Sequence, residues 1–121
     1  MSETESKIES LVQDWVYLPD ISERWGVLVT EVRKMVKEHR LIAVRRGENN
    51  ALQVPAAFIA DDGLVKHLGG TLTVLRDGGY DDEEILEWLF TEDPSLPGSP
   101  IQALREDRGT EVKRRAQAMA L

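Results

Sequence analysis

The feature that most restricts the fold of this chain is a series of start and stop signals between residues 19 and 55. Pro19 suits the first turn of a short helix, and Gly26 suits the position just after its last turn. Thr30 can cap a second helix over residues 31–40, along which valine and methionine recur at helical spacing. Two short helices joined by a tight turn are therefore expected here.

Alternating apolar residues follow the second helix on both sides of a turn sequence. Ile42 and Val44 alternate with less apolar residues, and Leu52 and Val54 repeat the pattern after the Gly-Glu-Asn-Asn sequence at residues 47–50. This pattern predicts a small β-hairpin. Helix, turn, helix and hairpin in this order form the layout of a winged helix-turn-helix, in which the hairpin is the wing.

The remaining segments have helical patterns. Residues 6–16 carry apolar residues at helical spacing, and Ser6 with Glu9 fits a capping box, so a short N-terminal helix is expected there. In the second half, glycines, prolines and acidic starts separate four expected helices, the last of them capped by Thr110: residues 64–76, 81–90, 100–105 and 111–120.

These elements predict a fold that is mainly α with a small β-hairpin wing, a winged helix-turn-helix plus a C-terminal helical bundle. A length of 121 residues suits one compact domain, or two small ones that share a core. We expect a flexible arm over residues 1–5, a winged helix-turn-helix DNA-binding domain with an N-terminal helix over residues 6–60, and a helical region for assembly or partner binding over residues 61–121.

Charge is distributed unevenly along the chain. The formal net charge is −7, yet residues 30–47 hold six lysines and arginines against two glutamates. That segment therefore carries +4, and the other residues together carry −11. Such an acidic chain is unsuited to coating nucleic acid non-specifically. A local basic patch can still act, because charges more than about 8 Å apart are largely screened at physiological salt.

The basic segment coincides with the helix and the wing that the layout assigns to DNA. In a helix-turn-helix the second helix lies in the major groove, and its N-terminal residues reach base edges. The alternative is that these charges form an ordinary solvated surface, which the coincidence with the layout disfavours. The candidate contacts are Thr30, Glu31, Arg33 and Lys34 for bases or adjacent phosphates, Lys37 and Arg40 for phosphates, and Arg45, Arg46, Asn49 and Asn50 from the wing.

The residue types present exclude several other functions. Without cysteine the chain has no disulfide, thiolate zinc site or cysteine nucleophile. His39 and His67 lack neighbours at metal-site spacing, so no metal is expected. No nucleophile, base and orienting group form a recognisable set, so we expect neither an enzyme nor a cofactor. The three tryptophans lie at helical spacing with leucine and isoleucine and are expected in the core: Trp15, Trp25 and Trp88.

The same sequence gives no sign of a membrane partner. No apolar run approaches the roughly 20 residues that span a bilayer. The N-terminal sequence MSETESKIES is polar and acidic, unlike a signal peptide. The expected location is the cytoplasm.

The stretch LPDISERWGVLVTEVRKMVKEHRLIAVRRGENNALQVPAAFI resembles the small winged-helix modules of the excisionase and MerR-like kind. Those modules usually have glycine between the recognition helix and the wing, where this chain has His39. A residue other than glycine is disfavoured there if φ is positive. The matching positions are Ile21, Trp25, Gly26, Val27, Thr30, Val32, Val36, Leu41, Ala43, Arg45, Val54 and Pro55.

Over residues 18–121 the chain also resembles an actinobacterial family of small winged helix-turn-helix DNA-binding proteins, described as substrates of a membrane Ser/Thr protein kinase. The stretches LIAVRR, LTVLRDGGYDDEEILEWLFTEDPSL and RRAQAMA carry this resemblance. It implies a phosphoacceptor in the N-terminal arm, where Thr4 is the one threonine of MSETES. It also implies a Ser/Thr protein kinase as a partner.

A further resemblance covers the C-terminal half. The stretch EEILEWLFTEDPSLPGSPIQALREDRGTEVKRRAQ is similar to the C-terminal domain of certain antitoxins, which makes protein–protein contacts. The matching residues are Trp88, Leu89, Pro94, Leu96, Pro100 and Leu104. This resemblance implies that the C-terminal half mediates homodimerisation or binds a protein partner.

Two functions follow from these patterns. The first is a DNA-binding transcriptional regulator, tuned by phosphorylation of the arm, whose homodimer would present two recognition helices to half-sites about 34–36 Å apart. The alternative is a protein-interaction module that has lost DNA binding, which the net charge and His39 favour and the basic helix and wing disfavour.

Overall fold

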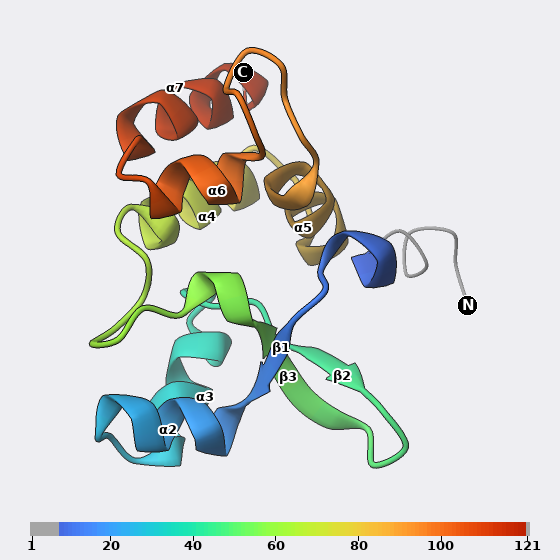
Figure 1. Ribbon diagram of the computed structural model, residues 1–121, viewed down its shortest axis with the longest axis vertical. Helices are drawn as coiled ribbons and strands as arrows, with labels where there is room; N and C mark the ends of the chain where they lie inside the picture. Colours follow the sequence, from blue (N-terminus) through green and yellow to red (C-terminus); the bar gives the residue numbers. More distant parts are fainter. Residues whose placement is uncertain (1–7, 121) are drawn as a thin grey trace.

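The computed structural model describes residues 8–120, and its elements form two halves that lie one above the other in Figure 1. The N-terminal half holds a small sheet with helices α2 and α3, and the C-terminal half holds helices α4 to α7. The fold class is the one expected, mainly helical with a small antiparallel sheet. Within residues 8–120, no helix combines the length and the apolar character needed to cross a membrane.

Helix α2 spans Leu18–Trp25 and has a proline in its first turn, as expected. Gly26 ends the helix in the left-handed conformation, with φ 69°, which glycine adopts without steric cost. The hydroxyl of Ser22 donates to the carbonyl of Val27 at 2.5 Å, and the amide of Val27 donates to the carbonyl of Ser22 at 3.1 Å. These two bonds close the tight turn between α2 and α3.

Helix α3 spans Val29–Lys37, so it begins earlier than the expected range of 31–40. Leu28, in extended conformation, is the residue before the first turn, and no side chain caps the helix. The expectation that Thr30 is the cap is wrong, because Thr30 already lies inside the first turn. The connection between α2 and α3 is therefore two residues shorter than the one expected from the sequence.

The end of α3 also differs from the expectation, since the helix stops at Lys37. His39 has φ 62°, and a left-handed residue cannot continue a right-handed helix. The amide of Arg40 donates to the carbonyl of Met35 at 2.9 Å, which closes the helix end as in a Schellman motif. His39 therefore occupies the position, and the conformation, for which related modules favour glycine.

Three strands form an antiparallel sheet in the order β1-β3-β2 among the described residues. The strands are β1 (Trp15–Tyr17), β2 (Val44–Arg46) and β3 (Ala51–Pro55). In the register, Val16 lies opposite Val54, and Arg45 lies opposite Leu52. The hairpin of β2 and β3 is the expected wing, and it extends away from the helices in Figure 1.

Strand β1 replaces the second half of a predicted helix. Residues 8–11 are helical, but the expectation of a helix through residue 16 is wrong, because Trp15–Tyr17 pairs with β3. Aromatic and β-branched residues favour strands, and here pairing with a distant strand prevails over helical spacing. The expected capping by Ser6 and the expected flexible arm over residues 1–5 lie outside the described residues.

Helices dominate the C-terminal half. A short 3-10 helix, η1 (Ala56–Phe58), follows β3 and leads into them. The four α-helices are α4 (Leu68–Asp77), α5 (Asp82–Phe90), α6 (Pro100–Arg105) and α7 (Gly109–Met119). Asp81 and Glu84 form a reciprocal capping box at the start of α5. The expected helices near 81–90 and at 100–105 are confirmed.

Two expected helix starts in this half are wrong. The helix expected from residue 64 begins at Leu68, because Leu64 forms an antiparallel bridge with Ile59. The last helix begins at Gly109 and not after a Thr110 cap. A β-carbon at residue 109 would lie 2.4 Å from Cδ2 of His67, so this close approach requires glycine.

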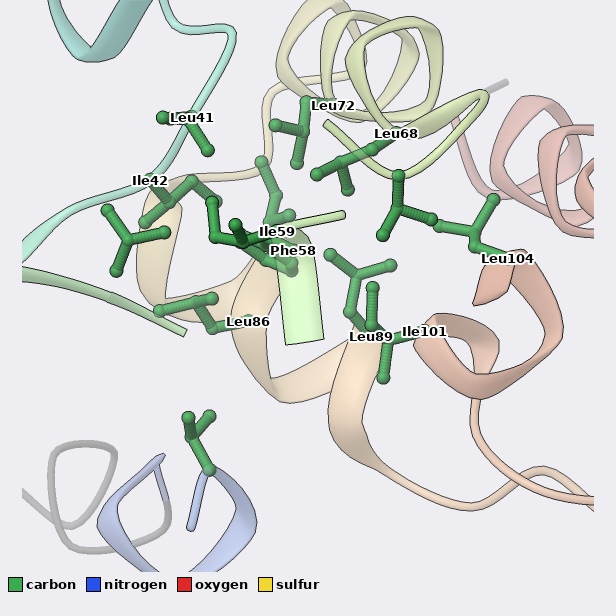
Figure 2. Close-up of a cluster of buried hydrophobic side chains, with 14 of the residues drawn as sticks. Leu41, Ile42, Phe58, Ile59, Leu68, Leu72, Leu86, Leu89, Ile101 and Leu104 are labelled. Atoms are coloured by element: carbon green, nitrogen blue, oxygen red, sulfur yellow. The ribbon is translucent and has the colours of Figure 1, made fainter. Parts of the chain in front are cut away.

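One hydrophobic core joins the two halves. Phe58 of η1 is fully buried, and Figure 2 shows it among leucine and isoleucine side chains from both halves. The other labelled members of this cluster are Leu41, Ile42, Ile59, Leu68, Leu72, Leu86, Leu89, Ile101 and Leu104. Arg105 of α6 adds a polar link by donating to the carbonyl of Ala57 at 2.9 Å. The C-terminal half thus supports the helices and the wing that carry the candidate site.

Candidate nucleic-acid interface

The outer face of α3 carries a stripe of polar and basic side chains. Thr30, Arg33, Lys34 and Lys37 are all exposed, and their spacing of three and four residues places them on one side of the helix. Val32 lies on the opposite side and is fully buried, which fixes the orientation of the helix on the core. The stripe is therefore held outward by packing.

Two further predicted contacts flank this stripe. Glu31 is exposed in the first turn of α3, where the helix dipole favours a carboxylate. Arg40 is exposed just beyond the left-handed turn at His39. The basic side chains of the segment thus continue past the helix end, while Glu31 places one negative charge near its start.

The wing presents Arg45 and Arg46 to opposite faces of the sheet, because successive side chains of a strand alternate. Arg45 is exposed, and its guanidinium donates to the carbonyl of Asn50 at 3.1 Å. Asn49 and Asn50 are exposed in the turn between β2 and β3. Arg45 and the two asparagines therefore share the tip of the wing.

Arg46 points the other way, is half-buried, and bonds to other residues of the protein. Its Nε donates to Oε1 of Glu9 at 2.8 Å, and its second terminal nitrogen donates to Oε2 at 2.5 Å. Its guanidinium also donates to the side chain of Gln53 at 3.2 Å and lies 4.3 Å from the ring centroid of Trp15. The hydrogen bonds from Arg46 hold the pKa of Glu9 below its ordinary value, and the pKa of Arg46 is raised in turn.

A groove of about 370 Å³ connects α3 to the wing. Arg33 of α3 lines it together with Arg45, Asn49 and Asn50, so four of the predicted residues meet at one concave surface. The remaining wall comes from the start of α2 and its surroundings: Tyr17, Leu18, Pro19, Ala51 and Leu52. Arg46 does not line this groove.

Two exposed side chains of this region were not predicted from the sequence. Tyr17 is 49% exposed at the wall of the groove, and Leu28 is 72% exposed immediately before α3. The sequence holds no usable signal for Leu28, because Val32 and Met35 follow it at helical spacing, four and seven residues later, as on a buried face. The sequence holds no signal for Tyr17 either, because the exposure of this side chain depends on strand β1.

The three tryptophans are partly buried and pack against the core, so they are placed largely as expected. The indole nitrogen of Trp25 donates to the carbonyl of Ala60 at 2.8 Å. Across residues 8–120, no group of three or more histidine, cysteine, aspartate or glutamate side chains is placed to hold a metal ion.

The chain matches two family descriptions that divide it near residue 60. Residues 6–59 match "DNA-binding protein Rv2175c, wHTH domain", and residues 65–120 match "Rv2175c C-terminal domain of unknown function". A relative from Mycobacterium tuberculosis (strain ATCC 25618 / H37Rv), DNA-binding protein Rv2175c, is 45% identical over 116 residues, which cover 85% of this chain and 78% of the relative.

A solved structure agrees with this relationship. The NMR structure of Rv2175c superposes with a TM-score of 0.79 at 40% sequence identity, over 89% of this chain and 82% of that one. The stripe on α3, the wing and the helical second half therefore occur in the context of a known winged helix-turn-helix, and the chain belongs to the Rv2175c family.

Proposed function

We propose that this protein binds double-stranded DNA, with α3 in the major groove and the wing on the adjacent backbone, and that it acts as a transcriptional regulator. The observation that carries the proposal is the groove in which Arg33 of α3 meets Arg45, Asn49 and Asn50 of the wing. The relative's description as a DNA-binding protein supports the same assignment.

The dimensions of α3 suit this placement. An α-helix with its side chains is about 10–12 Å in diameter, and the major groove, about 12 Å wide, admits it. Residues of the first turns, Thr30 and Arg33, would reach base edges, and Lys37 and Arg40 would meet phosphates. Arg46 has a different role in this proposal, since its bonds to Glu9 hold the wing against the N-terminal helix.

The charge distribution gives the proposal a measurable signature. Five exposed cations lie on the helix and wing: Arg33, Lys34, Lys37, Arg40 and Arg45. If each neutralises one phosphate, the slope of log K against log salt is about −4.5. The −11 carried by residues outside the basic segment opposes approach of DNA by any other face.

The test is fluorescence anisotropy of labelled random duplex DNA at 50, 100 and 200 mM salt. We expect binding with the slope given above, and its loss in the double variant Arg33→Glu with Lys37→Glu. The matched control is Lys113→Glu with Arg114→Glu, two exposed residues of α7, which Figure 1 places at the far end of the molecule from α3. Both double variants make the same change in net charge, so a difference between their affinities for DNA cannot result from net charge.

An absence of binding by the wild-type protein at 50 mM salt would refute the proposal. Equal losses in the two double variants would refute the assignment to α3, because they would show that net charge controls binding and not the face that carries it.

The proposal extends to regulation by a Ser/Thr protein kinase acting on Thr4. The resemblance of the chain to kinase substrates supports this step. A phosphate adds a charge of roughly −1.5 to −2, which would repel DNA from a nearby surface. We expect Thr4→Glu to bind random duplex more weakly than Thr4→Ala at 50 mM salt. Equal affinities would remove this part of the proposal.

A further inference from the structure

Exposed large hydrophobic side chains gather in one part of the molecule. Among residues 8–120 they are Tyr17, Val27 and Leu28, and all three lie in or next to the helix-turn-helix. Leu28 is the most exposed of the three, at 72%. A single exposed leucine is common on protein surfaces, so its meaning depends on where the backbone places it.

The backbone on both sides of Leu28 is fixed. The amide and the carbonyl of Val27 are both bonded to Ser22. On the other side, Val29 packs against the core and the amide of Glu31 donates to the carbonyl of Leu28 at 2.9 Å. The leucine is therefore held at the surface by the turn and the helix.

The neighbours of Leu28 determine what can cover it. It directly precedes α3, and the exposed residues that follow it in the first turns of this helix are Thr30, Glu31, Arg33 and Lys34. An exposed apolar side chain at the start of a helix that also carries exposed cations matches DNA, which combines phosphates with apolar groups on base edges. In the major groove the C5-methyl group of thymine is that apolar group, and aliphatic side chains contact it.

We propose that Leu28 reads the C5-methyl group of a thymine in the major groove. This inference rests on the proposed function and adds a specificity to it, namely that the preferred site contains thymine opposite the start of α3. The apolar contact selects thymine at this position, while the phosphate contacts of the cations supply affinity without sequence preference.

The test begins with selection of duplexes from a random library by the wild-type protein and by Leu28→Ala. The selected wild-type site is then synthesised with each thymine replaced in turn by deoxyuridine, which removes the methyl group and leaves the base-pairing edge unchanged. We expect one such replacement to weaken wild-type binding roughly three- to fivefold, the effect of exposing one methyl group. The same replacement should leave the affinity of Leu28→Ala unchanged.

The control variant is Arg45→Gln, which removes a cation of the wing. It should weaken binding to the thymine and deoxyuridine duplexes by the same factor, so that their ratio stays that of the wild type. Because Leu28 is largely exposed, Leu28→Ala should keep the wild-type thermal midpoint.

Three results would overturn the inference while leaving DNA binding intact. They are a selection without sequence preference, a wild-type site without a deoxyuridine-sensitive thymine, and an equal deoxyuridine effect in wild type and Leu28→Ala. A smaller dimer fraction of Leu28→Ala in sedimentation, with unchanged base preference, would assign the residue to contact between copies. Failure of the proposed function itself would be visible earlier, as no binding to random duplex at 50 mM salt.

Discussion

Replacement of Phe58 by alanine should destabilise both halves of the molecule together. The side chain is fully buried, and its ring lies 5.7 Å from the ring of Phe90, centroid to centroid. Truncation of a buried phenylalanine costs about 3–5 kcal/mol. Domains of this size have a free energy of unfolding of about 5–15 kcal/mol, so the variant should lose a large part of its stability. Phe58→Leu, which preserves most of the volume, should lose considerably less.

The assay is urea denaturation followed separately in each half. Trp25 reports on the N-terminal half and Trp88 on the C-terminal half, so two proteins that each retain one of them, with phenylalanine at the other tryptophan positions, supply the probes. Because the core is continuous, we expect the two probes to give one midpoint. Phe58→Ala should move both midpoints by the same amount.

Separate midpoints for the two probes in the parent proteins would refute the reasoning. So would a Phe58→Ala variant in which the signal of Trp88 keeps its midpoint while that of Trp25 shifts. Either result would mean that the halves unfold independently and that the packing around Phe58 contributes little to their association.

Three further predictions concern single positions. Glu9→Gln should lower stability by at most about 1 kcal/mol at pH 7, since half of the Glu9 side chain is exposed. Because the pKa of Glu9 is lowered by folding, this difference should be present above the unfolded pKa of about 4.3 and vanish as the pH falls through the folded pKa, as thermal midpoints from pH 7 to 2 will check. His39→Gly should raise the free energy of unfolding in urea by about 0.5–1 kcal/mol, because glycine adopts φ 62° without strain. Gly109→Ala should lower the free energy of unfolding by about 1–3 kcal/mol, because the added methyl group would overlap the ring of His67. An unchanged urea midpoint in His39→Gly or in Gly109→Ala would contradict the corresponding prediction.

Much of the winged helix-turn-helix could be predicted because its signals are local. Pro19 and Gly26 bound α2 through properties of their own backbones, and the turn at residues 47–50 likewise acts within a few residues. The same holds for α5 and α6, whose starts carry an acidic cap and a proline. Signals of this kind do not depend on what lies elsewhere in the fold.

The N-terminal strand and the orientation of the wing arginines could not be predicted, because both depend on distant partners. Trp15 fits the helical spacing of the residues before it, and its strand exists because β3, about forty residues later, pairs with it. Arg45 and Arg46 carry the same charge in the sequence, yet one faces the groove and the other bonds to Glu9. Strand alternation alone could have separated the two arginines, but the position of Glu9 follows from the fold.

The pairing of β1 with β3 also bears on how the molecule forms during synthesis. Residues 15–17 hold residues 53–55, so α2 and α3 lie in a loop that closes after β3 has left the ribosome. Phe58, which follows β3, then packs against Phe90 of α5, and α6 is joined to the same segment by the bond from Arg105 to the carbonyl of Ala57. Domains fold as units, and here the unit is completed only after α6 has been synthesised. We therefore expect α3, the helix that we propose reads DNA, to gain its support from α5 and α6 long after its own synthesis.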